Sequence, residues 1–266
     1  MLLFTIPHAG EEIPSACYWL QKLPSEVLLR DVDRFVDDLY QPVIERFQIP
    51  YVKTRYHRYV VDLNRDPQDI DQESVLGASL PPGTHPRGYH WVRTTMGERL
   101  LPQPMSWELH ETLTQLIYQP FHQQIGQLLQ QKHAHSVGPI WHFDLHSMPS
   151  VGTSEHRDPG EVRADVVISD QKGRSCGVQV LDVTMLAFLK AGFKVAYNWP
   201  YYGGRITERY GRPEIGHHTL QIELNRRLYL DEVTKAKRPQ GYAETQQKLL
   251  KAFEIIYDAY QELQHP

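Results

Sequence analysis

Short apolar runs alternate along this chain with longer segments in which apolar residues recur every three or four positions. The short runs predict strands, and the longer segments predict amphipathic helices. We expect strands at residues 2–6, 51–56, 59–63, 139–146, 166–169, 193–198 and 219–224, and helices at 25–47, 107–131, 177–191 and 242–263. Strands that alternate with helices form mainly parallel sheets with helices on both faces. The sequence therefore predicts an α/β fold.

The composition is that of an ordinary globular protein. Hydrophobic residues make up 41% and charged residues 23% of the chain, and no repeat or low-complexity linker divides it, so we expect one domain over residues 1–266. The net charge of -4 argues against binding to nucleic acid. No apolar run approaches the roughly 20 residues of a membrane span, and the first residues do not resemble a signal peptide. Two cysteines are too few for a disulfide framework, so we expect a cytoplasmic protein.

Two histidines lie at the carboxyl ends of predicted strands, where α/β sheets bind ligands. His8 follows the first strand and Glu11 comes three residues later, a spacing at which both can bind one divalent cation. His146 ends the strand at 139–146, and Asp144 lies on the same strand face, where it suits the carboxylate behind a metal-bound histidine. Each pair alone also fits a structural histidine. Together they predict a catalytic metal site with His8, Glu11 and His146 as ligands and one open coordination position.

Further polar residues complete the candidate site. Glu223 lies in an apolar strand, where burial should raise its pKa and suit it to act as a general base. Asn64 and Arg65 leave the strand predicted at 59–63, and Arg205 follows two glycines. A guanidinium group matches a carboxylate through two parallel hydrogen bonds, so these arginines are candidates for binding an acidic small molecule.

Residues 66–104 are rich in proline and glycine and show little apolar periodicity. A loop of this length inside a compact domain is usually functional, so we expect a lid or a pocket wall. Among the remaining histidines, we expect His57, His142 and His156 to be structural and His122 to be a candidate substrate contact.

The motifs, taken in order, resemble those of the N-formylglutamate amidohydrolase (deformylase) family. The resemblance covers nearly the whole chain and is carried by residues 7–10, 33–40, 59–65, 118–122, 144–150, 198–207 and 221–229. Zinc carboxypeptidases and aspartoacylase are more distantly similar in their order of ligands, Asn-Arg pair and late Glu. The resemblance implies a three-layer α/β/α fold, phosphorylase/hydrolase-like and zinc exopeptidase-like. It also implies hydrolysis of N-formyl-L-glutamate to formate and L-glutamate, a late step of histidine degradation.

The resemblance also implies a division of roles. One divalent cation, with Zn²⁺ as the first choice, is held by the ligands above, and Glu223 is the base. Arg58 stabilises the developing negative charge, Asn64 and Arg65 bind the α-carboxylate, and Arg205 binds the side-chain carboxylate.

Two questions stay open at this point. Glu12 or Asp33 can replace Glu11 as the carboxylate ligand, because the matching position in the family is not reliably acidic. The rival functions are a deacylase or carboxypeptidase acting on another N-acyl amino acid, and a non-catalytic ligand-binding protein of the same fold.

Overall fold

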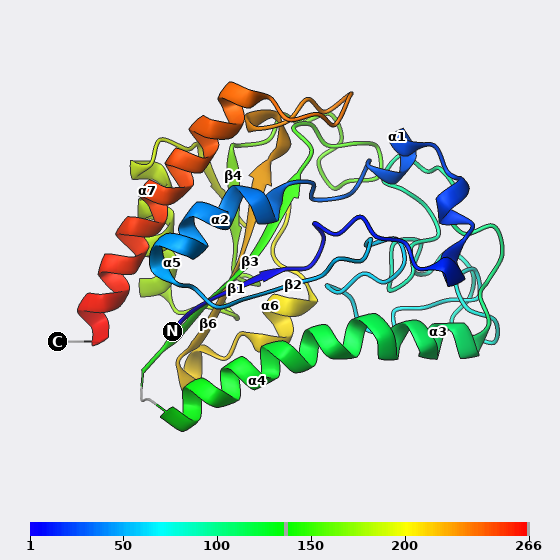
Figure 1. Ribbon diagram of the computed structural model, residues 1–266, viewed down its shortest axis with the longest axis horizontal. Coiled ribbons are helices and arrows are strands. Elements are labelled where there is room, and N and C mark those ends of the chain that lie inside the picture. Colours follow the sequence, from blue (N-terminus) through cyan, green and yellow to red (C-terminus); the bar gives the residue numbers. More distant parts are fainter. Residues whose placement is uncertain (136–137, 265–266) are drawn as a thin grey trace.

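The computed structural model describes residues 1–135 and 138–264, and the described residues contain one six-stranded sheet (Figure 1). The strand order is β2-β1-β3-β6-β4-β5. The strands are β1 (Leu2–Ile6), β2 (Tyr51–Lys53), β3 (Ile140–Met148), β4 (Val166–Ser169), β5 (Val195–Tyr197) and β6 (His217–Asn225). Strands β2, β1, β3 and β6 are parallel, whereas β4 pairs with β6 in the antiparallel sense. The carboxyl ends of β1, β3 and β6 therefore meet at one edge.

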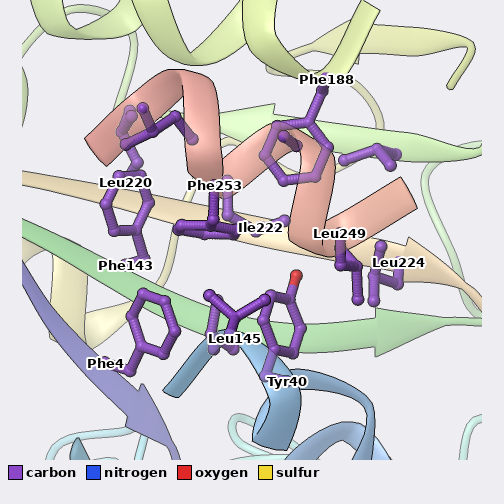
Figure 2. Close-up of a cluster of buried hydrophobic side chains, with 14 of the residues drawn as sticks. Phe4, Tyr40, Phe143, Leu145, Phe188, Leu220, Ile222, Leu224, Leu249 and Phe253 are labelled. Atoms are coloured by element: carbon purple, nitrogen blue, oxygen red, sulfur yellow. The ribbon is translucent and has the colours of Figure 1, made fainter. Parts of the chain in front are cut away.

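Helices cover both faces of the sheet, so the expected three-layer α/β/α fold is confirmed. One face packs against α2 (Val36–Phe47), α5 (Val178–Lys190) and α7 (Pro239–Gln264). Figure 2 shows this core, in which the rings of Phe4 and Phe143 lie 5.0 and 5.2 Å from that of Phe253 on α7. The other face packs against α4 (Gln119–His135) and α6 (Arg205–Tyr210), and α3 (Trp107–Leu113) contributes to the same hydrophobic cluster. No helix in the described residues has both the length and the apolar character of a membrane span.

Strand β3 is buried along its whole length, yet its two faces differ in chemistry. Trp141, Phe143 and Leu145 point into the core with α7. Side chains alternate between the two faces of a strand, so His142, Asp144 and His146 share the opposite face. A buried strand with one polar face is costly unless the polar groups are partnered, which indicates a site on that face.

The helix expected at residues 25–47 is interrupted. The structure has α1 (Ser25–Leu28) and α2, with a non-helical segment between them. Phe35 adopts a left-handed conformation with φ of 66°, and the backbone N–H of Asp33 donates to the carbonyl of His8 at 3.0 Å. The prediction of one helix failed because Val32 is buried within the break and Val36 is buried directly after it, which preserves the helical periodicity.

Other expectations were also wrong in detail. Residues 59–63 form turns rather than a strand, although Tyr59, Val60 and Val61 are buried as a strand would be. The helix expected at 107–131 consists of α3, a π-helical turn (Thr114–Tyr118) and α4, with Pro120 in the first turn of α4. Helix α6 was not expected at all.

Three buried histidines give the fold a predictable sensitivity to acid. Burial lowers the pKa of His57 to about 4 and the pKa values of His90 and His122 to about 3. Each ring contacts a backbone carbonyl, that of Leu28 for His57, Val60 for His90 and Leu63 for His122. The histidine expected to contact substrate, His122, is therefore packed as a structural residue.

We expect the free energy of unfolding to fall as the pH drops below 6.5. The folded-state pKa of these histidines lies below the unfolded value of about 6.5, so the unfolded chain binds more protons and their contribution is lost toward pH 4 to 3. Each of these histidines should lower the free energy of unfolding by about 2 kcal/mol between pH 7 and pH 5. Urea unfolding at the two pH values measures this loss. The His122→Gln variant, which has one fewer group to protonate, should lose less than the wild type, and an equal loss would contradict the assignment.

Candidate active site

Three buried side chains from distant parts of the chain converge on one point. His8 follows β1, Asp33 lies in the break between α1 and α2, and His146 lies on β3. The two Nδ1 atoms are 3.1 Å apart, and Asp33 Oδ2 lies 3.1 Å from His146 Nδ1 and 3.5 Å from His8 Nδ1. Each of the three residues is at most 2% exposed. Among the described residues, these three form the group whose possible ligand atoms lie close enough together to bind one cation.

The geometry of this group fits a divalent cation. Ligand atoms bound tetrahedrally at about 2.0–2.1 Å lie roughly 3.3 Å from one another, close to the three distances here. The outer nitrogens are already engaged, because His8 Nε2 lies 2.7 Å from Asp62 Oδ1 and His146 Nε2 lies 2.8 Å from Asp144 Oδ2. A carboxylate only accepts hydrogen bonds, so each Nε2 carries a proton, and a neutral ring would turn its Nδ1 lone pair inward, toward a cation. A cation between these lone pairs removes their mutual repulsion.

The structure brings Asp33, rather than Glu11, to the two histidines. Glu11 accepts a hydrogen bond from Arg34 Nε at 2.8 Å, and its side chain is 41% exposed. Glu12 is exposed too and lies 3.3 Å from Arg55 Nε. Of the three carboxylates that the sequence left as alternatives, the geometry favours Asp33.

Two residues that the sequence did not predict for the site, Arg226 and Ser147, hold Asp33 in place. Its Oδ1 accepts from Arg226 Nη2 at 3.0 Å and from the Ser147 hydroxyl at 3.2 Å, which leaves Oδ2 for the histidines. Burial alone would raise the pKa of Asp33, but His146, His8 and Arg226 hold that pKa well below its usual range. No sequence pattern marks Arg226, because its partner lies 193 residues away.

Arg58 contacts the carboxylate that lies behind His8. Its Nη2 donates to Asp62 Oδ2 at 2.9 Å, and Trp91 Nε1 donates to the same oxygen at 2.9 Å. The guanidinium group also lies over the Trp91 ring, 4.5 Å from its centroid. Burial would raise the pKa of Asp62, but His8 and Arg58 hold it well below its usual range. Asp62, the carboxylate behind His8, was not singled out in the sequence.

Glu223 lies beside His146 on the neighbouring strand, in direct register with it. The residue is 6% exposed, and Gln221 Nε2 donates to its Oε1 at 2.8 Å. Burial and the negative charge of Asp33 raise the pKa of Glu223 to about 7, against the opposing effect of His146. A carboxylate with this pKa can both accept and return a proton near neutral pH.

These residues line a polar cavity of about 620 Å³. The predicted residues on its wall are His8, Arg58, Asn64, Arg65, His146, Arg205 and Glu223. The irregular segment 66–104 contributes Trp91 and Arg87, which supports its expected role as a pocket wall. Across the cavity, Arg87 Nη1 donates to Glu155 at 3.0 Å, and the hydroxyl of Thr153 donates to the carbonyl of Thr95 at 2.7 Å.

The three residues expected to bind substrate differ in the hydrogen bonds and ion pairs that they already form within the protein. Asn64 is buried, and its amide contacts Asp144 Oδ2 at 3.3 Å and accepts from the backbone N–H of Ile206 at 2.8 Å. Arg205 pairs with Asp66 and, at 3.0 Å, with Glu208. Arg65 donates to the carbonyls of Arg87 and Asn64, and no carboxylate in residues 1–135 and 138–264 forms an ion pair with it.

A buried glutamate of raised pKa beside a cluster of potential cation ligands is characteristic of hydrolases that activate water. The sequence profile described as N-formylglutamate amidohydrolase matches residues 1–230. N-formylglutamate deformylase from Pseudomonas aeruginosa is 30% identical over 87% of this chain and 82% of its own length. The enzyme of the same name from Pseudomonas putida is 26% identical over 94% of this chain and 89% of its own length.

A solved structure shows the same fold. The N-formylglutamate amidohydrolase from Ralstonia eutropha JMP134 superimposes with a TM-score of 0.84 at 25% identity, covering 99% of this chain and 93% of the other. The chain belongs to the N-formylglutamate amidohydrolase family, as the sequence motifs predicted. It is a hydrolase that acts on an amide bond.

Proposed function

We propose that the protein hydrolyses N-formyl-L-glutamate to formate and L-glutamate, using one divalent cation held by His8, Asp33 and His146. The observation that carries the proposal is the convergence of these three ligand atoms beside Glu223. Two relatives named N-formylglutamate deformylase support the choice of substrate. The reaction belongs to histidine degradation, and we expect it to take place in the cytoplasm. Zinc is the first candidate for the cation, because imidazole nitrogen and carboxylate oxygen are among its common ligands.

In the proposed mechanism, the bound cation would lower the pKa of water and polarise the formyl oxygen. Glu223 removes a proton from the attacking water as its oxygen bonds to the formyl carbon. Glu223 then returns that proton to the amide nitrogen as the C–N bond breaks, which releases formate and the amino group of glutamate. Arg58, fixed by Asp62 and Trp91, contributes a positive charge that stabilises the developing oxyanion.

We assign the α-carboxylate of the substrate to Arg65, whose guanidinium group lines the cavity without a carboxylate partner among the described residues. Asn64 supports this region by holding Asp144 and the first turn of α6. Arg205 stays our candidate for the side-chain carboxylate, which would share the guanidinium with Asp66 and Glu208. Arg157 and Arg174 also line the cavity, where Arg157 contacts Tyr202 and Arg174 contacts Gln171.

A substrate panel tests both the reaction and the role of Arg205. N-formyl-L-glutamate should be turned over at least tenfold faster, by kcat/KM, than N-formyl-L-glutamine, because a charged site rejects the neutral side chain. The panel also includes N-acetyl-L-glutamate, which keeps the charged side chain and changes only the acyl group. Arg205→Met should remove most of the preference for glutamate over glutamine, and the matched Arg174→Met variant should retain it. Faster turnover of acetyl substrates would instead support the rival deacylase. If Arg174→Met abolishes the preference and Arg205→Met does not, the carboxylate belongs to the other side of the cavity.

A further inference from the structure

A polar row continues from the candidate metal centre into the interior of the sheet. His142, Asp144 and His146 follow one another on a single face of β3, and Thr5 on β1 is in register with Asp144. His146 is 2% exposed, and the other three residues have no exposed surface. The mechanism proposed above uses neither Thr5 nor His142.

The hydrogen bonds in this row have a defined direction. The Thr5 hydroxyl donates to Asp144 Oδ1 at 2.8 Å and lies 3.0 Å from His142 Nε2. A hydroxyl has one hydrogen, and the carboxylate can only accept, so His142 Nε2–H must donate to the Thr5 oxygen. The other oxygen of Asp144, Oδ2, lies 2.8 Å from His146 Nε2. The order is therefore His142 to Thr5, Thr5 to Asp144, and His146 to Asp144.

We propose that Thr5 is a positioning residue for the cation site. In the described residues, the Thr5 hydroxyl is the only hydrogen-bond partner of Asp144 Oδ1. This bond sets the rotation of the carboxylate, so that Oδ2 faces His146 and the Nδ1 atom of that ring faces His8 and Asp33. The inference rests on the proposed function for the presence of the cation. In this proposal Asp144 orients His146, and Thr5 in turn orients Asp144.

The same sheet offers a matched control for a threonine hydroxyl. Thr219 on β6 is in register with His142 and has no exposed surface, as is true of Thr5. Its hydroxyl has no hydrogen-bond partner in the described part of the chain. Thr219→Val therefore removes a buried hydroxyl without breaking a hydrogen bond, whereas Thr5→Val removes one that links two polar side chains.

The test compares Thr5→Val, Thr5→Ser and Thr219→Val in three measurements. These are Zn²⁺ affinity in competition with a chelator, the visible absorption of the Co²⁺-loaded proteins, and kcat and KM on N-formyl-L-glutamate. Thermal unfolding of each metal-free protein reports folding. Thr5→Val should bind Zn²⁺ about tenfold more weakly, show an altered Co²⁺ spectrum and lose kcat with little change in KM. Thr5→Ser, which keeps the hydroxyl, should restore the affinity, and Thr219→Val should match the wild type.

Equal Zn²⁺ affinity and an equal Co²⁺ spectrum in Thr5→Val and Thr219→Val would overturn the inference. If Thr5→Val does not fold, Thr5→Cys keeps a similar volume with a weaker donor and takes its place with the same expected loss of affinity. The metal measurements involve no substrate. A wild type that binds Zn²⁺ but does not hydrolyse N-formyl-L-glutamate would therefore refute the proposed function while leaving this test intact.

Discussion

Replacing Glu223 with glutamine should lower kcat on N-formyl-L-glutamate by about a thousandfold, the middle of the range for losing a general base. Glutamine keeps the size and buried position of the side chain but cannot take a proton from water. Metal content should stay at the wild-type level, because Glu223 lies beside the three proposed ligands without being one of them. The exposed Glu12→Gln variant is a control with the same chemical change and should keep full activity.

The pH dependence of the wild type provides a second check on Glu223. Only the ionised form can act as a base, so kcat/KM should rise with pH through the pKa of Glu223. That pKa is about 7 without a cation, because burial disfavours the charge. A bound cation favours the carboxylate, so the rise should lie below pH 7 in the metal-loaded enzyme. A Glu223→Gln variant with more than a tenth of wild-type kcat would refute the assignment.

Replacing Asp33 with asparagine should weaken Zn²⁺ binding by at least a hundredfold and abolish most activity. The amide can still accept from Arg226 at the Oδ1 position, but it offers the two histidines a neutral group where Oδ2 now lies. A metal analysis after dialysis, combined with kcat, measures the effect. Glu11→Gln is the matched control, because Glu11 is the ligand that the sequence spacing favoured and lies instead against Arg34. Loss of metal in Glu11→Gln with retention in Asp33→Asn would reverse the choice of ligand.

Strand ends were the most informative feature of the sequence. The expected strand at 166–169 matches β4, and β1 and β3 begin and end within two residues of prediction. Because parallel strands end at a common edge, placing His8 and His146 at two such ends was enough to bring them together. Alternation along β3 placed Asp144 behind His146, and burial of the late strand accounts for the raised pKa of Glu223.

The proposed ligand Asp33 was harder to predict because local pattern and tertiary structure conflict there. Val32 is buried within the break and Val36 is buried at the start of α2, so apolar periodicity cannot distinguish this segment from one continuous helix. The ion-pair partners of the arginines could not be predicted from the sequence either. Arg205 pairs with Asp66, which lies 139 residues away, and no spacing rule relates two positions that meet only in the folded chain.

The interruption between α1 and α2 has a consequence for assembly. The three proposed ligand atoms come from positions 8, 33 and 146, and the N–H of Asp33 donates a hydrogen bond to the carbonyl of His8. The unfolded chain therefore contains no preformed site, and an ion gains its full set of contacts only after β1 and β3 have paired. Such an ion would act as a late cross-link, because it would stabilise only those molecules in which the central strands are already paired in register.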